Sequence, residues 1–146
     1  MSALLRPKFG SLDPAALAKA EAALSSLSGQ FDAWLDEEVS KLKAAHQAVL
    51  TDGLAGSAGE KLHTHAHDLK GLGGTYGYPI VTRIAGSLCN LVSEAEARGR
   101  APVALVTAHV DAIRTVVERR IRTDEDPAGR ALALALEAGV TAQTGG

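Results

Sequence analysis

Apolar residues recur at helical spacing along most of the chain. Leucine, isoleucine and valine return every three or four positions, which is the period of an amphipathic α-helix. The clearest stripe consists of Phe31, Leu35, Val39, Leu42, His46 and Val49. The run ALALAL at 131–136 alternates as a strand would, but its alanine content favours helix. The pattern predicts an all-α protein.

Capping and turn residues divide the chain into helices. Asp13 is a predicted N-cap with Pro14 at the first helical position, and Gly29 is predicted to close the helix that they open. We expect the later helices at 31–50, 57–77, 79–98, 102–121 and, as a short last helix, 131–139. We expect irregular chain at 1–11, turns or connectors at 51–59, 98–102 and 122–130, and fraying at 140–146.

These elements predict an antiparallel four-helix bundle with an accessory N-terminal helix and a short C-terminal extension. A length of 146 residues suits a single domain, 1–146, with a bundle core at about 12–122 and the extension at 123–146. Because the net charge is −2, no basic field indicates a nucleic-acid partner. The sequence shows neither a membrane-length apolar run nor a signal peptide, so we expect a cytoplasmic protein without a membrane partner.

One stretch, KLHTHAHDLKGLGGTYGYP at 61–79, combines three histidines, a lysine and several glycines. On a helical wheel Leu62, Leu69, Leu72 and Tyr76 share one side, and His67 lies about 160° from Leu69. His67 should therefore face outward. The residues within about 60° of it are Glu60, His63, Lys70, Gly71 and Gly74.

This outward face has the chemistry of a phosphoryl acceptor. Neutral imidazole is available as a nucleophile at cytoplasmic pH. A lysine ammonium offsets charge on a transferring phosphoryl group. Glycine in a helix interior costs about 0.5–1 kcal/mol relative to alanine, and at Gly71 and Gly74 that cost removes side-chain bulk beside His67. Gly73 lies off this face, so we expect it to serve tight helix packing instead.

The motif HDLKGLGGTYG resembles the phosphorylation motif of histidine-containing phosphotransfer (HPt) domains, over a bundle of about 12–122. The resemblance implies that Nε2 of His67 accepts a phosphoryl group from an aspartyl phosphate of a receiver domain and passes it to another receiver in a multistep phosphorelay. It implies that Lys70 stabilises the phosphate, that Gly71 and Gly74 permit close approach, and that Gly77 turns the chain. The expected partners are receiver domains of response regulators and hybrid histidine kinases.

The resemblance also implies a docking face and a division of labour. Receivers in the family dock on the phosphorylated helix and its neighbour, where His63, Arg83, Ser87 (or Gly86) and Asn90 would line the patch. The magnesium ion belongs to the receiver, so no cofactor, metal or autonomous kinase activity is expected on this chain, which needs no dimer. The sequence departs from the family where a glutamine often holds the histidine's other ring nitrogen: that place holds Cys89, beside Asn90.

Other functions fit the same residues. The chain is alternatively a phosphate sink, a phosphoacceptor-domain fragment of a chemotaxis-type histidine kinase, or a structural or metal-binding helical module. The i, i+4 pair of His63 and His67 suits a metal but lacks a third ligand in the sequence. We expect His65 to be partly buried and hydrogen-bonded, and His46 and His109 to be packing or boundary residues. Cys89, the one cysteine, should be a small buried hydrophobe.

Overall fold

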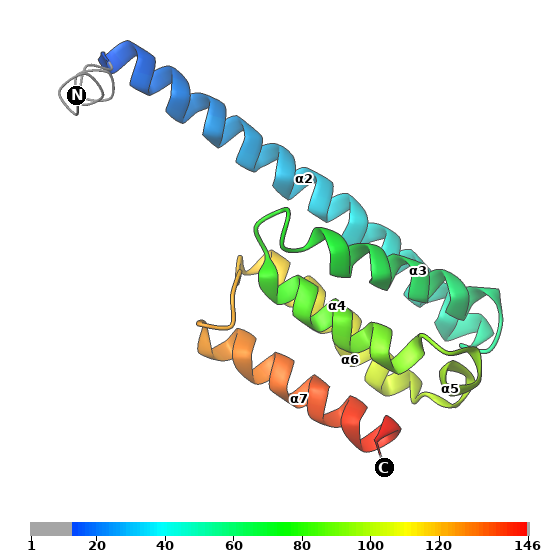
Figure 1. Ribbon diagram of the computed structural model, residues 1–146. Helices are drawn as coiled ribbons and strands as arrows, with labels where there is room; N and C mark the ends of the chain where they lie inside the picture. The colour runs from blue at the N-terminus through cyan, green and yellow to red at the C-terminus, as the bar shows by residue number, and fades with distance from the viewer. Residues whose placement is uncertain (1–12, 146) are drawn as a thin grey trace, which may run out of the picture. The chain divides into compact units, whose positions relative to one another are not determined.

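The computed structural model describes residues 13–145, and over this range the protein is all-helical, with six helices and no strand (Figure 1). The predicted irregular chain at 1–11 lies outside the described residues. The first helix, α2 (Pro14–Asp52), begins in one compact unit, which ends at residue 33, and extends into a second unit, which starts at residue 34. Within the described range, no helix combines the length and the hydropathy needed to cross a bilayer.

The first unit consists of the N-terminal part of α2, where every side chain from residue 13 to residue 30 is exposed. The helix does not end at Gly29, so the predicted stop there was wrong. A glycine raises the free energy of a helix by about 1 kcal/mol but does not break its hydrogen bonds. Neither a proline nor a new N-cap follows Gly29 at once, and α2 therefore continues through it.

The second unit contains the remaining helices, which are α3 (Ser57–Leu72), α4 (Pro79–Val92), α5 (Ala95–Arg100), α6 (Val103–Glu118) and α7 (Pro127–Thr144). Helix α4 contacts α3, α5, α6 and α7, and nine of its 14 residues are buried. Helices α3 and α6 each run antiparallel to α4, whereas α7 runs parallel to it (Figure 1). The core therefore lies around α4.

Several predicted helix boundaries were wrong. The helix expected at 57–77 ends at Leu72 and is followed by a turn at 73–77. The helix expected at 79–98 ends at Val92, and Arg98 turns back so that its Nη1 donates a hydrogen bond to the Val92 carbonyl at 3.0 Å. The buried guanidinium thus satisfies a free carbonyl at the negative end of the α4 dipole. A short separate helix, α5, carries it there.

The C-terminal helix is longer than the predicted 131–139, because α7 begins at Pro127 and ends at Thr144. Asp126 caps it by accepting hydrogen bonds from the amides of Ala128 at 2.8 Å and Gly129 at 3.3 Å. The residues of α7 that are buried against the rest of the unit are Gly129, Ala133, Leu136 and Val140. The segment expected to fray is helical as far as Thr144. Val140 is buried in it, and the side chains of residues 141–145 are exposed.

Two histidines are buried with their hydrogen bonds satisfied. His46, on α2, shares a hydrogen bond of 2.8 Å between its Nε2 and the Thr107 hydroxyl of α6. His109 is fully buried: its Nδ1 donates to the Leu105 carbonyl at 2.8 Å, which leaves Nε2 to accept from the Ser87 hydroxyl at 2.9 Å. Their predicted roles in packing are confirmed.

The packing of α7 predicts unequal effects for two neighbouring leucines. Leu136 is 6% exposed and Leu134 is 54% exposed. We expect Leu136→Ala to lower the free energy of unfolding by about 2–4 kcal/mol, because it leaves a cavity. Leu134→Ala, the matched control, should change it by less than about 0.5 kcal/mol. Urea titrations of both variants measure the difference, and equal effects would show that α7 is not packed as described.

The buried histidines predict that stability falls on mild acidification. Burial lowers the pKa of both His46 and His109. Below the ordinary value of about 6.5 the unfolded chain therefore binds more protons than the folded one, so the free energy of unfolding decreases as pH falls from about 6.5 toward the folded-state values. The slope is at most about 1.4 kcal/mol per pH unit for each ring. Urea titrations from pH 7.5 to 5.5 test this, and His46→Gln should flatten the curve. A stability that stays constant or rises on acidification contradicts the prediction.

Candidate functional site

The site is built beside a close approach between the chain that follows α3 and the first turn of α4. A Cβ atom at Gly73 would lie 2.7 Å from both the backbone nitrogen and the hydroxyl of Thr82, so only glycine fits there. The amide of Gly74 donates to the same hydroxyl at 2.8 Å. The expected packing role of Gly73 is confirmed, and this contact fixes the two helices against each other.

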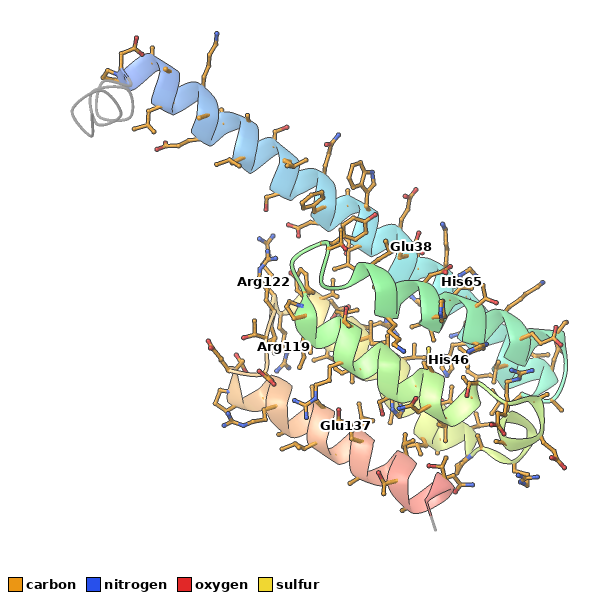
Figure 2. All side chains as sticks on the ribbon, in the orientation of Figure 1. Glu38, His46, His65, Arg119, Arg122 and Glu137 are labelled. Carbon is orange, nitrogen blue, oxygen red and sulfur yellow. The ribbon has the colours of Figure 1, made fainter. Side chains whose placement is uncertain are left out.

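The turn after α3 also needs glycine. Gly77 has a φ of +89°, a backbone conformation that side chains disfavour, and its predicted role in turning the chain is confirmed. Tyr78 then donates its amide to the Gly73 carbonyl at 2.8 Å, and Pro79 starts α4. The side chain of Arg122 supports the turn: Nη1 donates to the Gly77 carbonyl at 3.3 Å, and the guanidinium lies 4.4 Å from the Tyr78 ring centroid (Figure 2).

His67 is exposed on the outer face of α3, as the helical wheel predicts. Leu62 and Leu69, on the opposite side of the helix, are fully buried. Among the described residues, no side chain is seen to hydrogen-bond the His67 ring. The ring of His63, one turn earlier, stands edge-on to it with 6.3 Å between the centroids and 65° between the planes. The His67 imidazole is therefore exposed to solvent, with the His63 ring as its aromatic neighbour.

Lys70 lies one turn after His67 and is also exposed. Its side chain runs across α4 at Gly86, where Cγ, Cδ and Cε lie 3.8–3.9 Å from the position that a Cβ of residue 86 would occupy. The apolar stem thus rests on bare backbone while the ammonium stays in solvent. Its field reaches Cys89, where it offsets part of the effect of burial, which raises the pKa of that thiol.

The glycines on this face lack crowding neighbours. A Cβ at Gly71 would meet no atom within 4 Å, and one at Gly74 would meet only the Thr82 hydroxyl, at 3.7 Å. Both glycines are exposed. The surface beside His67 is therefore low because side chains are missing there, and not because the helices need to approach one another at these two positions.

The contacts between α3 and α4 set the register of the two helices. Gly73 meets Thr82 and Lys70 meets Gly86, so a position nearer the start of α3 faces one nearer the end of α4. Continued for one turn, this register places residues 89 and 90 at the level of His67. Cys89 is buried, as expected, and Asn90 is exposed. The amide of Asn90 is thus the polar group that α4 offers at this level.

The predicted polar stripe on α4 is divided among three environments. Asn90 faces solvent, but Ser87 is only 5% exposed and is bonded to His109. Arg83 is bound by acids that sequence reasoning missed. Its Nε and Nη2 donate to the two carboxylate oxygens of Glu137 at 2.8 and 2.7 Å, and its Nη1 donates to Asp124 at 3.0 Å. This pairing lowers the pKa of the Glu137 carboxyl.

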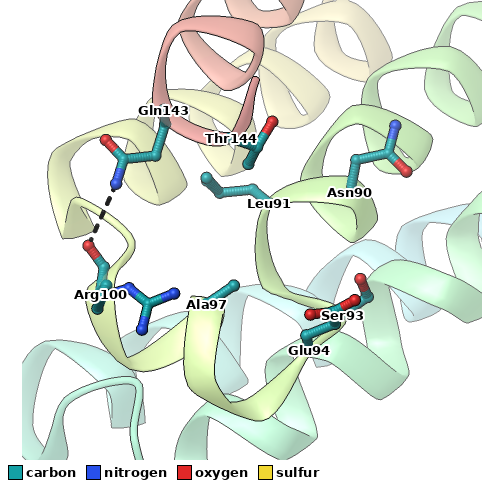
Figure 3. A pocket seen from close by; sticks show the side chains of 8 residues that line it. All are labelled: Asn90, Leu91, Ser93, Glu94, Ala97, Arg100, Gln143 and Thr144. Carbon is teal, nitrogen blue, oxygen red and sulfur yellow. Dashed lines mark hydrogen bonds between the residues drawn. The ribbon is translucent and has the colours of Figure 1, made fainter. Parts of the chain in front are cut away.

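Helix α7 contributes one wall to the surface next to Lys70. A shallow cavity of about 420 Å³ lies between α4 and α7, lined by Lys70, Arg83, Gly86, Asn90, Glu137 and Thr141, among others. A second cavity of about 330 Å³ lies beyond Asn90 and reaches Arg100 and Gln143 (Figure 3). The sequence contains one indication that this part of α7 has a polar role: Glu137 is the only charged residue from 131 to 146.

His65, the remaining histidine of the stretch at 61–79, differs from what the sequence predicted in one respect. His65 is partly buried, as predicted, but its Nδ1 has no hydrogen-bond partner within residues 13–145. No group of three or more His, Cys, Asp or Glu side chains in the described part of the chain is arranged to hold a metal ion.

No family model, curated protein or solved structure matches this chain.

Two glycines of the site predict opposite changes in stability. Gly71→Ala places a methyl group in open space on a helix, so we expect the free energy of unfolding to rise by up to about 1 kcal/mol. Gly73→Ala forces the α4 backbone at Thr82 to move, so we expect a loss of about 1–3 kcal/mol. Thermal and urea unfolding of the pair measure both effects. If Gly73→Ala is as stable as the wild type, the close approach described here does not exist in solution.

Proposed function

We propose that the protein is a histidine phosphotransfer protein, which accepts a phosphoryl group on His67 from a receiver-domain aspartyl phosphate and passes it to another receiver. One observation carries the proposal: His67 is exposed, with Lys70 one turn away and with Gly71 and Gly74 uncrowded beside it. Most exposed histidines have no such neighbours. The HPt-like motif of the sequence supports the same assignment.

The proposed reaction needs little from this chain beyond a nucleophile and a cation. The Nε2 lone pair of neutral His67 attacks phosphorus, the bond from phosphorus to the aspartyl oxygen breaks, and the aspartate leaves as a carboxylate. Lys70 offsets the charge on the phosphoryl oxygens during transfer. In this proposal the receiver supplies the magnesium ion, and the reverse reaction to a second receiver uses the same groups.

The proposed fold is a four-helix bundle formed by residues 34–52 of α2 together with α3, α4 and α6. The hydrogen bond between His46 and Thr107 supports the pairing of α2 with α6, and Leu35 and Leu42 are fully buried. Helix α7 adds a further layer on α4 and α6. In this arrangement a receiver docks on the outer faces of α3 and α4, close to the wall that α7 provides.

Phosphoryl transfer from labelled receivers tests the proposal. We expect a panel of receiver domains carrying ³²P-aspartyl phosphate to label the full chain with an acid-labile, alkali-stable phosphate. His67→Gln should abolish the label and His65→Gln, on the same helix, should retain it. Lys70→Ala should slow labelling by about tenfold or more, which is about 1.4 kcal/mol of transition-state stabilisation, because the phosphoryl charge loses its cation.

Controls separate this function from its alternatives. Lys61→Ala removes an exposed lysine from the same helix and should leave the rate unchanged. A chase with a second, unlabelled receiver distinguishes a relay, which passes the label onward, from a phosphate sink, which loses it to water. Labelling by ATP alone, or labelling of His67→Gln at the wild-type rate, would contradict the proposed reaction.

A further inference from the structure

His63 belongs to the stretch at 61–79 and was expected to line the docking patch, but the proposed reaction gives it no chemical role so far. It lies on the same face of α3 as His67, one turn toward the N-terminus, and is partly buried. The two rings meet edge to face, 6.3 Å apart between centroids. The pair lacks a third metal ligand among residues 13–145. The arrangement therefore offers a second polar group within reach of whatever His67 carries.

Helix geometry directs the His67 side chain toward His63. Each Cα–Cβ bond of an α-helix tilts toward the N-terminus, so a long side chain covers the turn before its own Cα. The edge-to-face contact of the rings agrees with this tilt. A phosphoryl group on His67 would thus have Lys70 on its C-terminal side and His63 on its N-terminal side.

We propose that His63 is a second phosphoryl-binding residue, whose ring N–H donates a hydrogen bond to the phosphoryl group on His67. The inference rests on the proposed function and deepens it. His63 transfers no proton in the step: the bond from phosphorus to the aspartyl oxygen breaks as Nε2 of His67 bonds to phosphorus, and the N–H of His63 stays intact. Its hydrogen bond stabilises the phosphorylated state of this chain relative to that of the receiver.

The charge state of His63 suits this role before and after transfer. Burial first, then the fields of Arg98 and His67, lowers the pKa of His63. A neutral His63 adds no positive charge beside His67 while the nucleophile must stay unprotonated. Once His67 carries a dianionic phosphoryl group, that charge favours protonation of His63, which strengthens the hydrogen bond.

Few other charges act on His63 from the neighbouring helices. On α3 itself Glu60 lies one turn earlier, and α5 contributes Arg98. The pKa of Lys41, on α2, is raised first by its hydrogen bond to Glu38 and then by the charges of Glu38, Glu37 and Asp68. By the register above, α4 presents uncharged Asn90 at this level, and the chain after it presents Ser93 and the exposed carboxylate of Glu94. The phosphoryl group would therefore be the dominant new charge that His63 meets.

Three variants of the full chain test the inference. His63→Phe keeps an aromatic ring and removes the donor, whereas His63→Gln keeps an N–H donor; His65→Phe is the matched control on the same helix. Each is equilibrated with one ³²P-labelled receiver, and the fraction of label on each protein is measured. We expect His63→Phe to shift the equilibrium toward the receiver by about tenfold, because a charge-assisted hydrogen bond is lost. We expect His63→Gln, whose amide donates only a neutral hydrogen bond, to shift the equilibrium by a smaller factor of about threefold, and His65→Phe to stay within about twofold of the wild type.

A spectroscopic measurement on the wild type decides the question even if His63→Phe folds poorly. In ¹⁵N NMR at pH 7, phosphorylation should move the ring nitrogens of His63 toward imidazolium shifts and leave those of His109 in place. Wild-type protein that takes label, with no change at His63 and an unshifted equilibrium in His63→Phe, overturns this inference alone. Wild-type protein that takes no label from any receiver overturns the proposed function and this inference with it.

Discussion

The contact of Gly73 with Thr82 is the constraint on which the site depends. Because a Cβ at Gly73 would lie 2.7 Å from the Thr82 backbone nitrogen, this contact restricts the axial position and the rotation of α3 against α4. That rotation turns Leu62 and Leu69 inward and therefore turns His67 outward. It also brings the stem of Lys70 across α4. The orientation of the proposed nucleophile is thus a consequence of packing on the other side of the same helix.

Of the two cations near the outer face of α3 and α4, one is already paired with acidic side chains in the folded protein. Arg83 would be a natural phosphate ligand by residue type, yet its guanidinium is held by Glu137 and Asp124. A bidentate pair of this kind costs free energy to open. Among residues 13–145 no carboxylate forms an ion pair with Lys70, whose flexible stem rests on Gly86. Its compact charge is therefore free to follow a transferring group. Helix α7 therefore influences the site because its Glu137 holds Arg83, which is then not free to bind a phosphoryl group.

The sequence predicts those features that depend on one helix at a time. Helical period alone places His67 outward and Leu69 inward, and the distinction between Gly71 and Gly73 follows from the same wheel. Features that depend on a tertiary partner are not visible in this way: Ser87 is drawn inside by His109 and Arg83 is bound by Glu137. The length of α7 was missed for another reason. Asp126 and Pro127 repeat the cap recognised at Asp13 and Pro14, but the surrounding charges favoured a loop.

Gly71 and Gly73 were both noticed in the sequence as glycines in a predicted helix, but the structure gives them different reasons. Gly73 is required by the backbone of α4, whereas at Gly71 a side chain would meet nothing within 4 Å. Packing therefore explains Gly73, which follows the end of α3, and leaves Gly71 unexplained, although a glycine inside a helix costs about 1 kcal/mol. A residue that costs stability and fills no packing need is expected where another molecule must approach. Since Gly71 lies within one turn of His67 and of Lys70, the cost falls where a receiver carrying an aspartyl phosphate would have to fit.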